Sequence, residues 1–354
     1  MNWKNQSSLN TNHTVAVLGA GKFGTAVANV LASNAKRVWL YTNKAARAFE
    51  AQMSRNCADQ RLLPNVEVTD DLIAVLRSCS VVFPIVPAVH FRALMRQIAP
   101  YLTDRHMLIH GTKGFDLAHR TTDEPLQRRH IATMTEVVLQ ETGVRRMGCM
   151  AGPNLAADLI RKQPAATVVA SDSEVVLAVG KQLLTNTWFR VCTQKDVLSV
   201  EFCSVLKNIF AIGAGLLRGS GYGENTYAFF LTGALSEMNY MLETIGINAC
   251  ALMGPAGIGD LIATCGSSTS RNYTIGYRLA KGAPLQEILM HMKEVSEGVQ
   301  TVRTMFQLMQ SYGRRAPLTD VIYRILFQQL PLQKGVAYLM RYTTKGLASC
   351  MPSS

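Results

Sequence analysis

Short apolar runs alternate with helical stretches of hydrophobic and polar residues across the first half of the chain. From residue 14 to about residue 193, the runs read as strands at residues 15–18, 37–41, 81–86, 107–110, 148–151, 166–170 and 189–191. Between them lie helical patterns at residues 24–33, 45–55 and 90–99, the last of which ends before Pro100. Crossovers of this length join parallel strands, so the pattern predicts a doubly wound α/β domain with a parallel sheet covered on both faces.

The second half of the chain carries apolar residues at helical spacing and few β-branched runs. Helical segments begin near Val200, Thr226, Leu285, Thr301 and Thr319, so this half is predicted to be all-helical. The change falls near residues 194–197, where the sequence has no Gly or Pro linker, and we expect two domains that share an interface and a cleft. The predicted division is a flexible tail over residues 1–13, an α/β domain over 14–194 and a helical domain over 195–354.

Composition narrows the class of protein. Of 354 residues 48% are hydrophobic, which argues against a disordered chain, and no apolar stretch reaches about 18 residues without a polar or glycine interruption, which argues against an integral membrane segment. The first 13 residues lack the apolar core of a signal peptide, so we expect a cytoplasmic protein. The net charge of +12 is spread along the chain, which does not indicate nucleic-acid binding and would also suit a phosphorylated small molecule.

Cysteine and histidine positions give no metal signature. The eight cysteines are scattered without a CxxC pair, and several lie in apolar runs, so we expect buried free thiols rather than disulfides or zinc ligands. His106 and His110 have the spacing of helical metal ligands, but the residues between them read as a strand. We therefore expect no metal.

A glycine-rich turn follows the first predicted strand and opens an apolar helix. In the run GAGKFG, Gly19 makes the tight turn, Gly21 leaves room for a pyrophosphate, and Gly24 allows the helix and strand to pack closely. The free backbone amides of the helix N-terminus then hold the anion. Strand, turn and helix together predict a dinucleotide-binding site of the Rossmann type.

The end of the second strand leaves the choice of dinucleotide open. A fold specific for NAD usually has Asp or Glu there, whereas this chain reads Tyr41, Thr42, Asn43, Lys44. Lys44 and Arg47 would suit the 2′-phosphate of NADP, although both also fit solvated surface cations. NADP and NAD both stay possible.

A lysine lies in an apolar helical stretch of the second half. In VLKNIFAIGAGLL the only polar side chains are those of Lys207 and Asn208, and the helical face of Lys207 is otherwise small or apolar. Burial costs an ammonium its hydration, so it either pairs with a carboxylate or has a lowered pKa, and both make it a candidate proton donor or acceptor. A lysine whose stem covers apolar surface while its head reaches water is the alternative.

A second cluster of polar residues follows later in the helical half. The run GIGDLIATC places Asp260 in an apolar helical stretch, and five residues beyond Cys265 come Ser270, Arg271 and Asn272. Arginine offers a planar fork for phosphate oxygens, and Ser and Asn add neutral hydrogen bonds. Helix capping by Ser270 or Asn272 is the structural alternative.

Nine segments in this order carry a family resemblance: GAGKFGTA, IVPAVHF, GTKGFD, AGPNLAADL, VLKNIFAIGAG, GYGENTYA, GIGDLIATC, SRN and SEGVQTV. Over residues 14–330 the chain resembles the bacterial type of NAD(P)-dependent glycerol-3-phosphate dehydrogenase. The resemblance implies a Rossmann domain followed by an all-helical domain, a homodimer, and interconversion of sn-glycerol 3-phosphate and dihydroxyacetone phosphate for phospholipid synthesis.

The same resemblance implies roles for individual residues. The catalytic residues would be Lys207, Asp260 and Thr264. The substrate would be bound by Lys113, Gly152, Asn154, Asn208, Ser270, Arg271 and Asn272. The dinucleotide would be bound by Gly19, Gly21, Lys22, Phe23, Gly24, Asn43, Lys113, Ala156, Arg271, Val295 and Glu297.

The chain departs from the family pattern at a few positions. Phe23 stands for the usual tryptophan, Asn154 for serine, Asn43 for arginine and Asp158 for glutamate, and the chain end lacks the usual acidic residues. The change at Asn43 leaves NADP preference open, and none of these changes removes a group that the reaction needs.

These residues suggest a mechanism. We expect Lys207 to exchange a proton with the substrate oxygen, Asp260 to orient the ammonium from hydrogen-bonding distance, and Arg271 with Lys113 to fix the phosphate.

Two other functions are consistent with parts of the sequence. One is a dehydrogenase of the same two-domain plan that acts on a hydroxy acid or a ketopantoate-like substrate; such families place an asparagine three or four residues after the lysine, whereas Asn208 is adjacent. The other is a dinucleotide-binding sensor without catalysis, against which Lys207, Asp260, Thr264 and Arg271 argue.

Overall fold

The computed structural model describes residues 11–117, 124–292 and 296–338, and they divide into two compact units. The first unit comprises residues up to Thr112 together with Thr133–Val197, and the second comprises Lys113–Ala132 together with the chain from Leu198 onward. The described residues of Lys113–Ala132 therefore pack with the helical second unit, whereas the sequence predicted this segment inside an unbroken first domain. Which unit such a segment packs with depends on tertiary contacts, and no local sequence pattern predicts these contacts.

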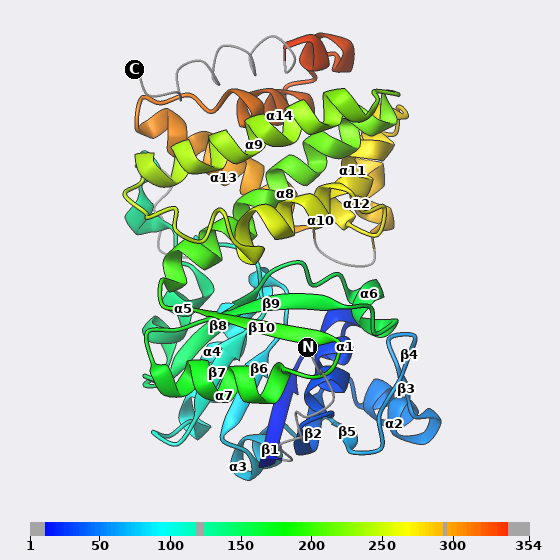
Figure 1. Ribbon diagram of the computed structural model, residues 1–354, viewed down its shortest axis with the longest axis vertical. Helices are drawn as coiled ribbons and strands as arrows, with labels where there is room; N and C mark the ends of the chain where they lie inside the picture. The colour runs from blue at the N-terminus through cyan, green and yellow to red at the C-terminus, as the bar shows by residue number, and fades with distance from the viewer. Residues whose placement is uncertain (1–10, 118–123, 293–295, 339–354) are drawn as a thin grey trace, which may run out of the picture. The chain divides into compact units, whose positions relative to one another are not determined.

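An eight-stranded sheet forms the centre of the first unit (Figure 1). Its spatial order is β10, β9, β8, β7, β6, β1, β2, β5. The strands are β1 (Thr11–Leu18), β2 (Ala35–Tyr41), β5 (Val66–Thr69), β6 (Val81–Pro84), β7 (Met107–His110), β8 (Met147–Ala151), β9 (Ala165–Ala170) and β10 (Phe189–Gln194), and a small hairpin pairs β3 (Asn56–Cys57) with β4 (Gln60–Arg61). Strands β3, β4 and β5 were not predicted from the sequence.

Two expectations about these strands were wrong. Strand β1 begins at Thr11, so residues 11–13 are part of the sheet and not of a tail. All neighbouring strands of the large sheet are parallel except β8 and β9, which pair antiparallel. The connection between β8 and β9 turns back along the sheet, with only the five-residue helix α6 (Ala156–Ile160) in it, so β9 and β10 run opposite to the other strands.

Helices cover both faces of the sheet, and consecutive residues of its central strands, whose side chains point to opposite faces, are therefore buried. Val15 and Val17 belong to a core cluster with α1 (Lys22–Leu31) and α7 (Glu174–Leu184), while the alternating Ala16 and Leu18 are also buried. The remaining helices of this unit are α2 (Ala45–Ser54), α3 (Leu72–Ser78), α4 (Ala88–Ile98) and α5 (Met134–Glu141). Helix α4 contacts both α3 and α5. The predicted Rossmann-type fold is confirmed.

The described part of the second unit is helical beyond Leu198 (Figure 1). Its helices are α8 (Val197–Gly219), α9 (Glu224–Thr244), α10 (Asp260–Cys265), α11 (Arg271–Ala280), α12 (Leu285–His291), α13 (Glu297–Ser311) and α14 (Pro317–Phe327). Among the described helices, α8 has the length and composition to cross a membrane, but 89% of its apolar window is buried inside the protein. Its hydrophobic surface is therefore used in packing.

Candidate active site

Lys207 lies in the middle of α8 with a side chain that is only 6% exposed. Its Nζ is 3.0 Å from Oδ1 of Asp260 and donates to Oγ1 of Thr264 at 2.5 Å. The buried ammonium is thus paired and hydrogen-bonded, as a buried charge must be. Of the two readings of the sequence, the structure contains the paired lysine and not the one whose head reaches water.

Asp260 and Thr264 face Lys207 because they lie four residues apart on α10, and therefore on one side of that helix. Thr264 Oγ1 donates to Asp260 Oδ1 at 3.1 Å, which closes a three-membered hydrogen-bonded group with Lys207. A π-helical turn, Pro255–Gly259, leads directly into Asp260, and such turns are frequent at functional sites. Position 257 requires glycine, since a Cβ there would lie 2.1 Å from the carbonyl oxygen of Leu252.

Lys113 binds the second oxygen of the same carboxylate. Its Nζ lies 2.7 Å from Asp260 Oδ2, and its side chain is 17% exposed. Two ammonium groups therefore share one carboxylate that is almost fully buried, which leaves an excess positive charge at the site. Such a site is suited to an anionic substrate.

The surroundings of Lys207 change its proton affinity. Burial lowers the pKa of Lys207 to about 8, because desolvation outweighs the opposing effect of the Asp260 carboxylate, and the charge of Lys113 lowers it further. A lysine with a pKa near 8 exchanges protons readily near neutral pH. Burial also raises the pKa of the neighbouring Cys265 thiol, so this group stays neutral.

Ser270, Arg271 and Asn272 form the N-terminal end of α11. Ser270 caps this helix by accepting from the backbone N–H of Tyr273 at 3.4 Å, Arg271 is exposed, and Asn272 is buried. The capping alternative for Ser270 is therefore realised, and it leaves the hydroxyl proton available to a ligand. Asn208, buried on α8, has no side-chain hydrogen bond to the described part of the protein.

The glycine turn in the first unit has the shape that a dinucleotide needs. Gly19 has φ +124°, and a Cβ on it would lie 2.1 Å from the Ile85 carbonyl oxygen, while a Cβ on Gly24 would lie 1.9 Å from the carbonyl oxygen of Gly19. A Cβ on Gly21, in contrast, would meet nothing within 4 Å. No side chain caps the start of α1 at Gly21. The residues present fit a pyrophosphate held on the helix N-terminus.

Other predicted dinucleotide contacts lie around this turn. Phe23 packs beside Gly111, since a Cβ on Gly111 would come within 3.2 Å of its ring, and exposed Lys22 forms an ion pair with Asp59 at 3.4 Å. Asn43 is exposed after β2, and Arg47 donates to the carbonyl oxygen of Ala20 at 3.4 Å, which places its guanidinium at the turn.

The segment after β8 holds further predicted residues of the first unit. Gly152 has φ +141°, and buried Asn154 donates from Nδ2 to Thr167 Oγ1 at 2.8 Å. The Oδ1 atom of Asn154 is buried without a partner in the described structure, as expected of a group that binds a ligand. Ala156 is the first residue of α6, Glu297 is the first residue of α13, and Val295 lies outside the described residues.

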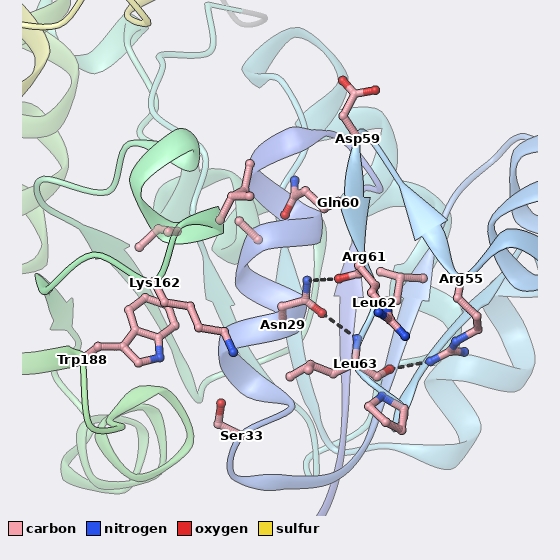
Figure 2. Close-up of a pocket in the computed structure, with 14 residues that line it drawn as sticks. Asn29, Ser33, Arg55, Asp59, Gln60, Arg61, Leu62, Leu63, Lys162 and Trp188 are labelled. Carbon is pink, nitrogen blue, oxygen red and sulfur yellow. Dashed lines mark hydrogen bonds between the residues drawn. The ribbon is translucent and has the colours of Figure 1, made fainter.

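A cavity of about 730 Å³ lies elsewhere in the first unit (Figure 2). None of the predicted site residues lines it. Asn29 of α1 fixes one wall, because its side chain donates to the Arg61 carbonyl and accepts from the backbone N–H of Leu63. The cavity adjoins the glycine turn, since its lining residues Asp59 and Gln60 contact Lys22, but it holds none of the candidate residues itself.

Sequence reasoning missed two connections among these residues. It predicted Lys113 as a ligand-binding residue but not its ion pair with Asp260, and it did not predict contacts of Asn272 with residues 296 and 298. The only signal in the sequence was the presence of polar residues in apolar segments. Among the cysteines of the described residues, five are buried free thiols as expected, whereas Cys192 and Cys250 are exposed; Cys350 lies outside the described residues.

A dinucleotide-type glycine turn and a buried lysine with a carboxylate partner define the class of dinucleotide-dependent oxidoreductases. Residues 14–177 match the family described as NAD-dependent glycerol-3-phosphate dehydrogenase N-terminus, and residues 196–337 match its C-terminus. The chain belongs to the NAD-dependent glycerol-3-phosphate dehydrogenase family.

Individual relatives agree with this assignment. The chain is 34% identical over 330 residues to a glycerol-3-phosphate dehydrogenase [NAD(P)+] of Teredinibacter turnerae, which covers 92% of this chain and 94% of the relative. It resembles the crystal structure of glycerol-3-phosphate dehydrogenase from Coxiella burnetii with a TM-score of 0.83 and 30% identity, covering 93% and 98% of the two chains. A ketopantoate reductase from Ralstonia eutropha, at 13% identity and a TM-score of 0.58 with 92% and 99% covered, shares the fold alone.

Proposed function

We propose that this protein interconverts sn-glycerol 3-phosphate and dihydroxyacetone phosphate with NAD or NADP, and so supplies glycerol 3-phosphate for phospholipid synthesis. The observation that carries the proposal is the buried Lys207, held by Asp260 and Thr264 in a chain of this family. The excess positive charge at Asp260 suits a phosphate ester.

Lys207 acts as the proton carrier at the C2 oxygen of the substrate. When bound, the reduced nicotinamide supplies the hydride that reduces the ketone. The Lys207 ammonium donates a proton to the oxygen that becomes the alcohol, and in the reverse direction the neutral amine accepts it. Asp260 and Thr264 hold the Nζ atom in place through contacts of 3.0 and 2.5 Å, so the proton is delivered at a fixed position.

The remaining polar residues of the second unit bind the anionic end of the substrate. Arg271 offers a planar fork for two phosphate oxygens, and the Ser270 hydroxyl and the Asn208 and Asn272 amides add neutral donors. Lys113 adds positive charge next to Asp260. Gly152 and Asn154 of the first unit complete the proposed substrate contacts.

The dinucleotide is bound through the glycine turn of the first unit. Gly19, Gly21 and Gly24 shape the turn, Lys22, Phe23, Asn43 and Ala156 surround it, and Arg271, Val295 and Glu297 make the remaining proposed contacts. A homodimer and a cytoplasmic location belong to the proposal on the family resemblance, and a molar mass in solution equal to that of one chain would contradict the dimer.

A substrate comparison tests the function. The absorbance of NADH and of NADPH is followed with dihydroxyacetone phosphate and, separately, with ketopantoate and other 2-keto acids as the substrates of the alternative dehydrogenases. We expect oxidation with dihydroxyacetone phosphate at a kcat/KM at least about a hundredfold above that with any keto acid, because a keto acid leaves the phosphate-binding donors unpaired. Oxidation of neither dinucleotide by dihydroxyacetone phosphate would refute the proposal.

A further inference from the structure

The side-chain oxygen of Asn272 is occupied by the protein itself. Asn272 Oδ1 accepts from Ser296 Oγ at 2.7 Å and from the backbone N–H of Gly298 at 3.2 Å. Asn272 is 9% exposed, so these bonds are shielded from water. Two donors on one atom fix the orientation of the amide group, with Oδ1 towards residues 296 and 298.

The two donors flank Glu297, a proposed dinucleotide contact. Gly298 fits closely in this position, since a Cβ there would lie 2.4 Å from Asn272 Oδ1 and 3.0 Å from the carbonyl oxygen of Asn208. The Asn272 amide therefore links the start of α11 to the start of α13, and Gly298 lies against the backbone of α8 beside Lys207. Residues on either side of Glu297 cannot shift without disturbing Asn272.

The amide nitrogen of Asn272 differs from the oxygen in its hydrogen bonding. In residues 11–117, 124–292 and 296–338, Nδ2 makes no hydrogen bond to the protein. Because the oxygen is held by its two donors, the nitrogen presents two protons, and donors of this kind suit a phosphate oxygen.

We propose that Asn272 couples the two ligands of the enzyme: Nδ2 binds the substrate phosphate, and Oδ1 transmits that binding to the Ser296–Gly298 segment, where it favours binding of the dinucleotide. This inference rests on the proposed function. Coupling between two binding sites is reciprocal, so the substrate strengthens dinucleotide binding by the same factor by which the dinucleotide strengthens substrate binding.

A dead-end pair of ligands measures the coupling without turnover. Reduced dinucleotide and glycerol 3-phosphate are both in the reduced state and do not react, so the dissociation constant of NADH or NADPH is measured by its fluorescence with and without saturating glycerol 3-phosphate. The ratio of the two constants is the coupling factor. For the unaltered protein we expect a factor of about ten or more, within the range usual for coupled sites.

Three variants examine the route of coupling. Ser296→Ala removes one donor to Oδ1 and is expected to reduce the factor about fivefold, the effect of one hydrogen bond. Ser296→Thr keeps a hydroxyl and should restore the factor. Gly298→Ala introduces the Cβ that collides with Oδ1 and should abolish coupling. Ser236→Ala is the matched control, since its hydroxyl bonds only the Thr232 carbonyl one turn earlier on α9.

The outcomes separate this inference from the proposed function. If the coupling factor of the unaltered protein is near one, or if Ser296→Ala keeps the full coupling factor, the proposed coupling through Asn272 is refuted while the proposed function stands. If Ser296→Ala weakens each ligand alone but leaves the factor unchanged, Asn272 is merely structural and the inference is again wrong. Failure of the unaltered protein to bind glycerol 3-phosphate refutes the proposed function itself.

Discussion

At the scale of single residues, the charge arrangement around Asp260 determines how Lys207 holds its proton. Burial lowers the pKa of Lys207, Asp260 raises it, and Lys113 lowers it, which gives a value of about 8. In ketone reduction the protonated lysine is the active form, so kcat/KM should fall as pH rises through about 8. In alcohol oxidation the neutral amine is the active form, so the rate should rise over the same range.

Removal of the Lys113 charge should move this pH dependence. Lys113→Met lowers activity, because Lys113 is a proposed ligand contact, but the pH midpoint of the remaining reduction should move upward, since a repelling charge has been lost. Asp260→Asn should move it downward, because the stabilising carboxylate is lost. The pH profiles of kcat/KM provide the measurement. A midpoint that is unchanged in both variants would show that Lys207 does not titrate in the reaction.

Arg47 provides a residue-level test of dinucleotide choice. Its guanidinium lies at the glycine turn through the contact with Ala20, where it can meet the 2′-phosphate of NADP. We expect Arg47→Ala to raise KM for NADPH about tenfold and to change KM for NADH less than twofold. Lys181→Ala, on α7, is a control for the loss of surface charge. Equal changes for both dinucleotides would exclude this role for Arg47.

At the scale of elements, close contact between α8 and α11 sets the position of the proposed phosphate-binding residues. A Cβ on Gly215 of α8 would lie 2.0 Å from the Tyr273 carbonyl oxygen, and one on Gly276 of α11 would lie 1.9 Å from the Ile212 carbonyl oxygen. The two helices therefore touch through their backbones. Because α8 carries Lys207 and α11 begins at Arg271, this contact determines how the proposed proton carrier and the proposed anion-binding residues are spaced.

Gly276→Ala should consequently destabilise the protein. The added methyl group collides with backbone that cannot move independently of α8, so the free energy of unfolding should fall by about 2 kcal/mol or more. Urea unfolding measures the change. Gly223→Ala is the control, since a Cβ there meets nothing within 4 Å, and it should change the free energy of unfolding by less than about 1 kcal/mol. Similar effects of the two substitutions would contradict the close contact.

A buried carboxylate joins α9 to α14. Glu237 accepts from the backbone N–H of Leu318 at 2.7 Å and from the N–H and the hydroxyl of Thr319 at 2.9 and 2.7 Å. Burial raises the pKa of Glu237 to about 7, against the lowering effect of these donors, and nearby Asp320 raises it further. Glu237 thus holds a proton in the folded protein at pH values where the unfolded chain has released it.

The stability of the protein should therefore depend on pH through Glu237. A raised acid pKa means that the folded state binds more protons between pH 4.5 and 7, so the contribution of Glu237 to stability decreases as pH rises over this range, by roughly 3 kcal/mol in total. Glu237→Gln, which cannot ionise, should lack this contribution. Urea unfolding of both proteins at pH 5 and pH 7.5 measures the difference. Parallel pH dependence in the two proteins would contradict the shifted pKa.

At the scale of the whole molecule, the sequence predicted elements better than their connections. Strand β7 has the predicted bounds, and the GAGKFG turn has the predicted conformation, because periodicity and glycine geometry are local properties. The reversal of β9, the short edge strand β5 and the placement of residues 113–132 in the second unit were missed. These features depend on which segments meet in space, and short runs such as Val66–Thr69 give little local signal.

In the candidate site, too, contacts between residues close in the sequence were predictable, whereas contacts between distant residues were not. Asp260 and Thr264 lie four residues apart, so their common face was predictable once the helix was, and an apolar helix suggested a partner for Lys207. The second ion pair of Asp260 comes from Lys113, 147 residues away in the sequence, and the contacts of Asn272 come from residues 24 and 26 positions away. No spacing rule predicts contacts of this kind.

The proposed role of Lys207 as the proton carrier in the reduction of dihydroxyacetone phosphate is tested by the turnover of Lys207→Met. Methionine keeps an unbranched side chain of similar length but cannot exchange a proton, so the packing of α8 should persist. We expect kcat to fall by at least about a hundredfold, while reduced dinucleotide still binds within about threefold of the unaltered protein. A kcat within about tenfold of the unaltered protein would contradict this role.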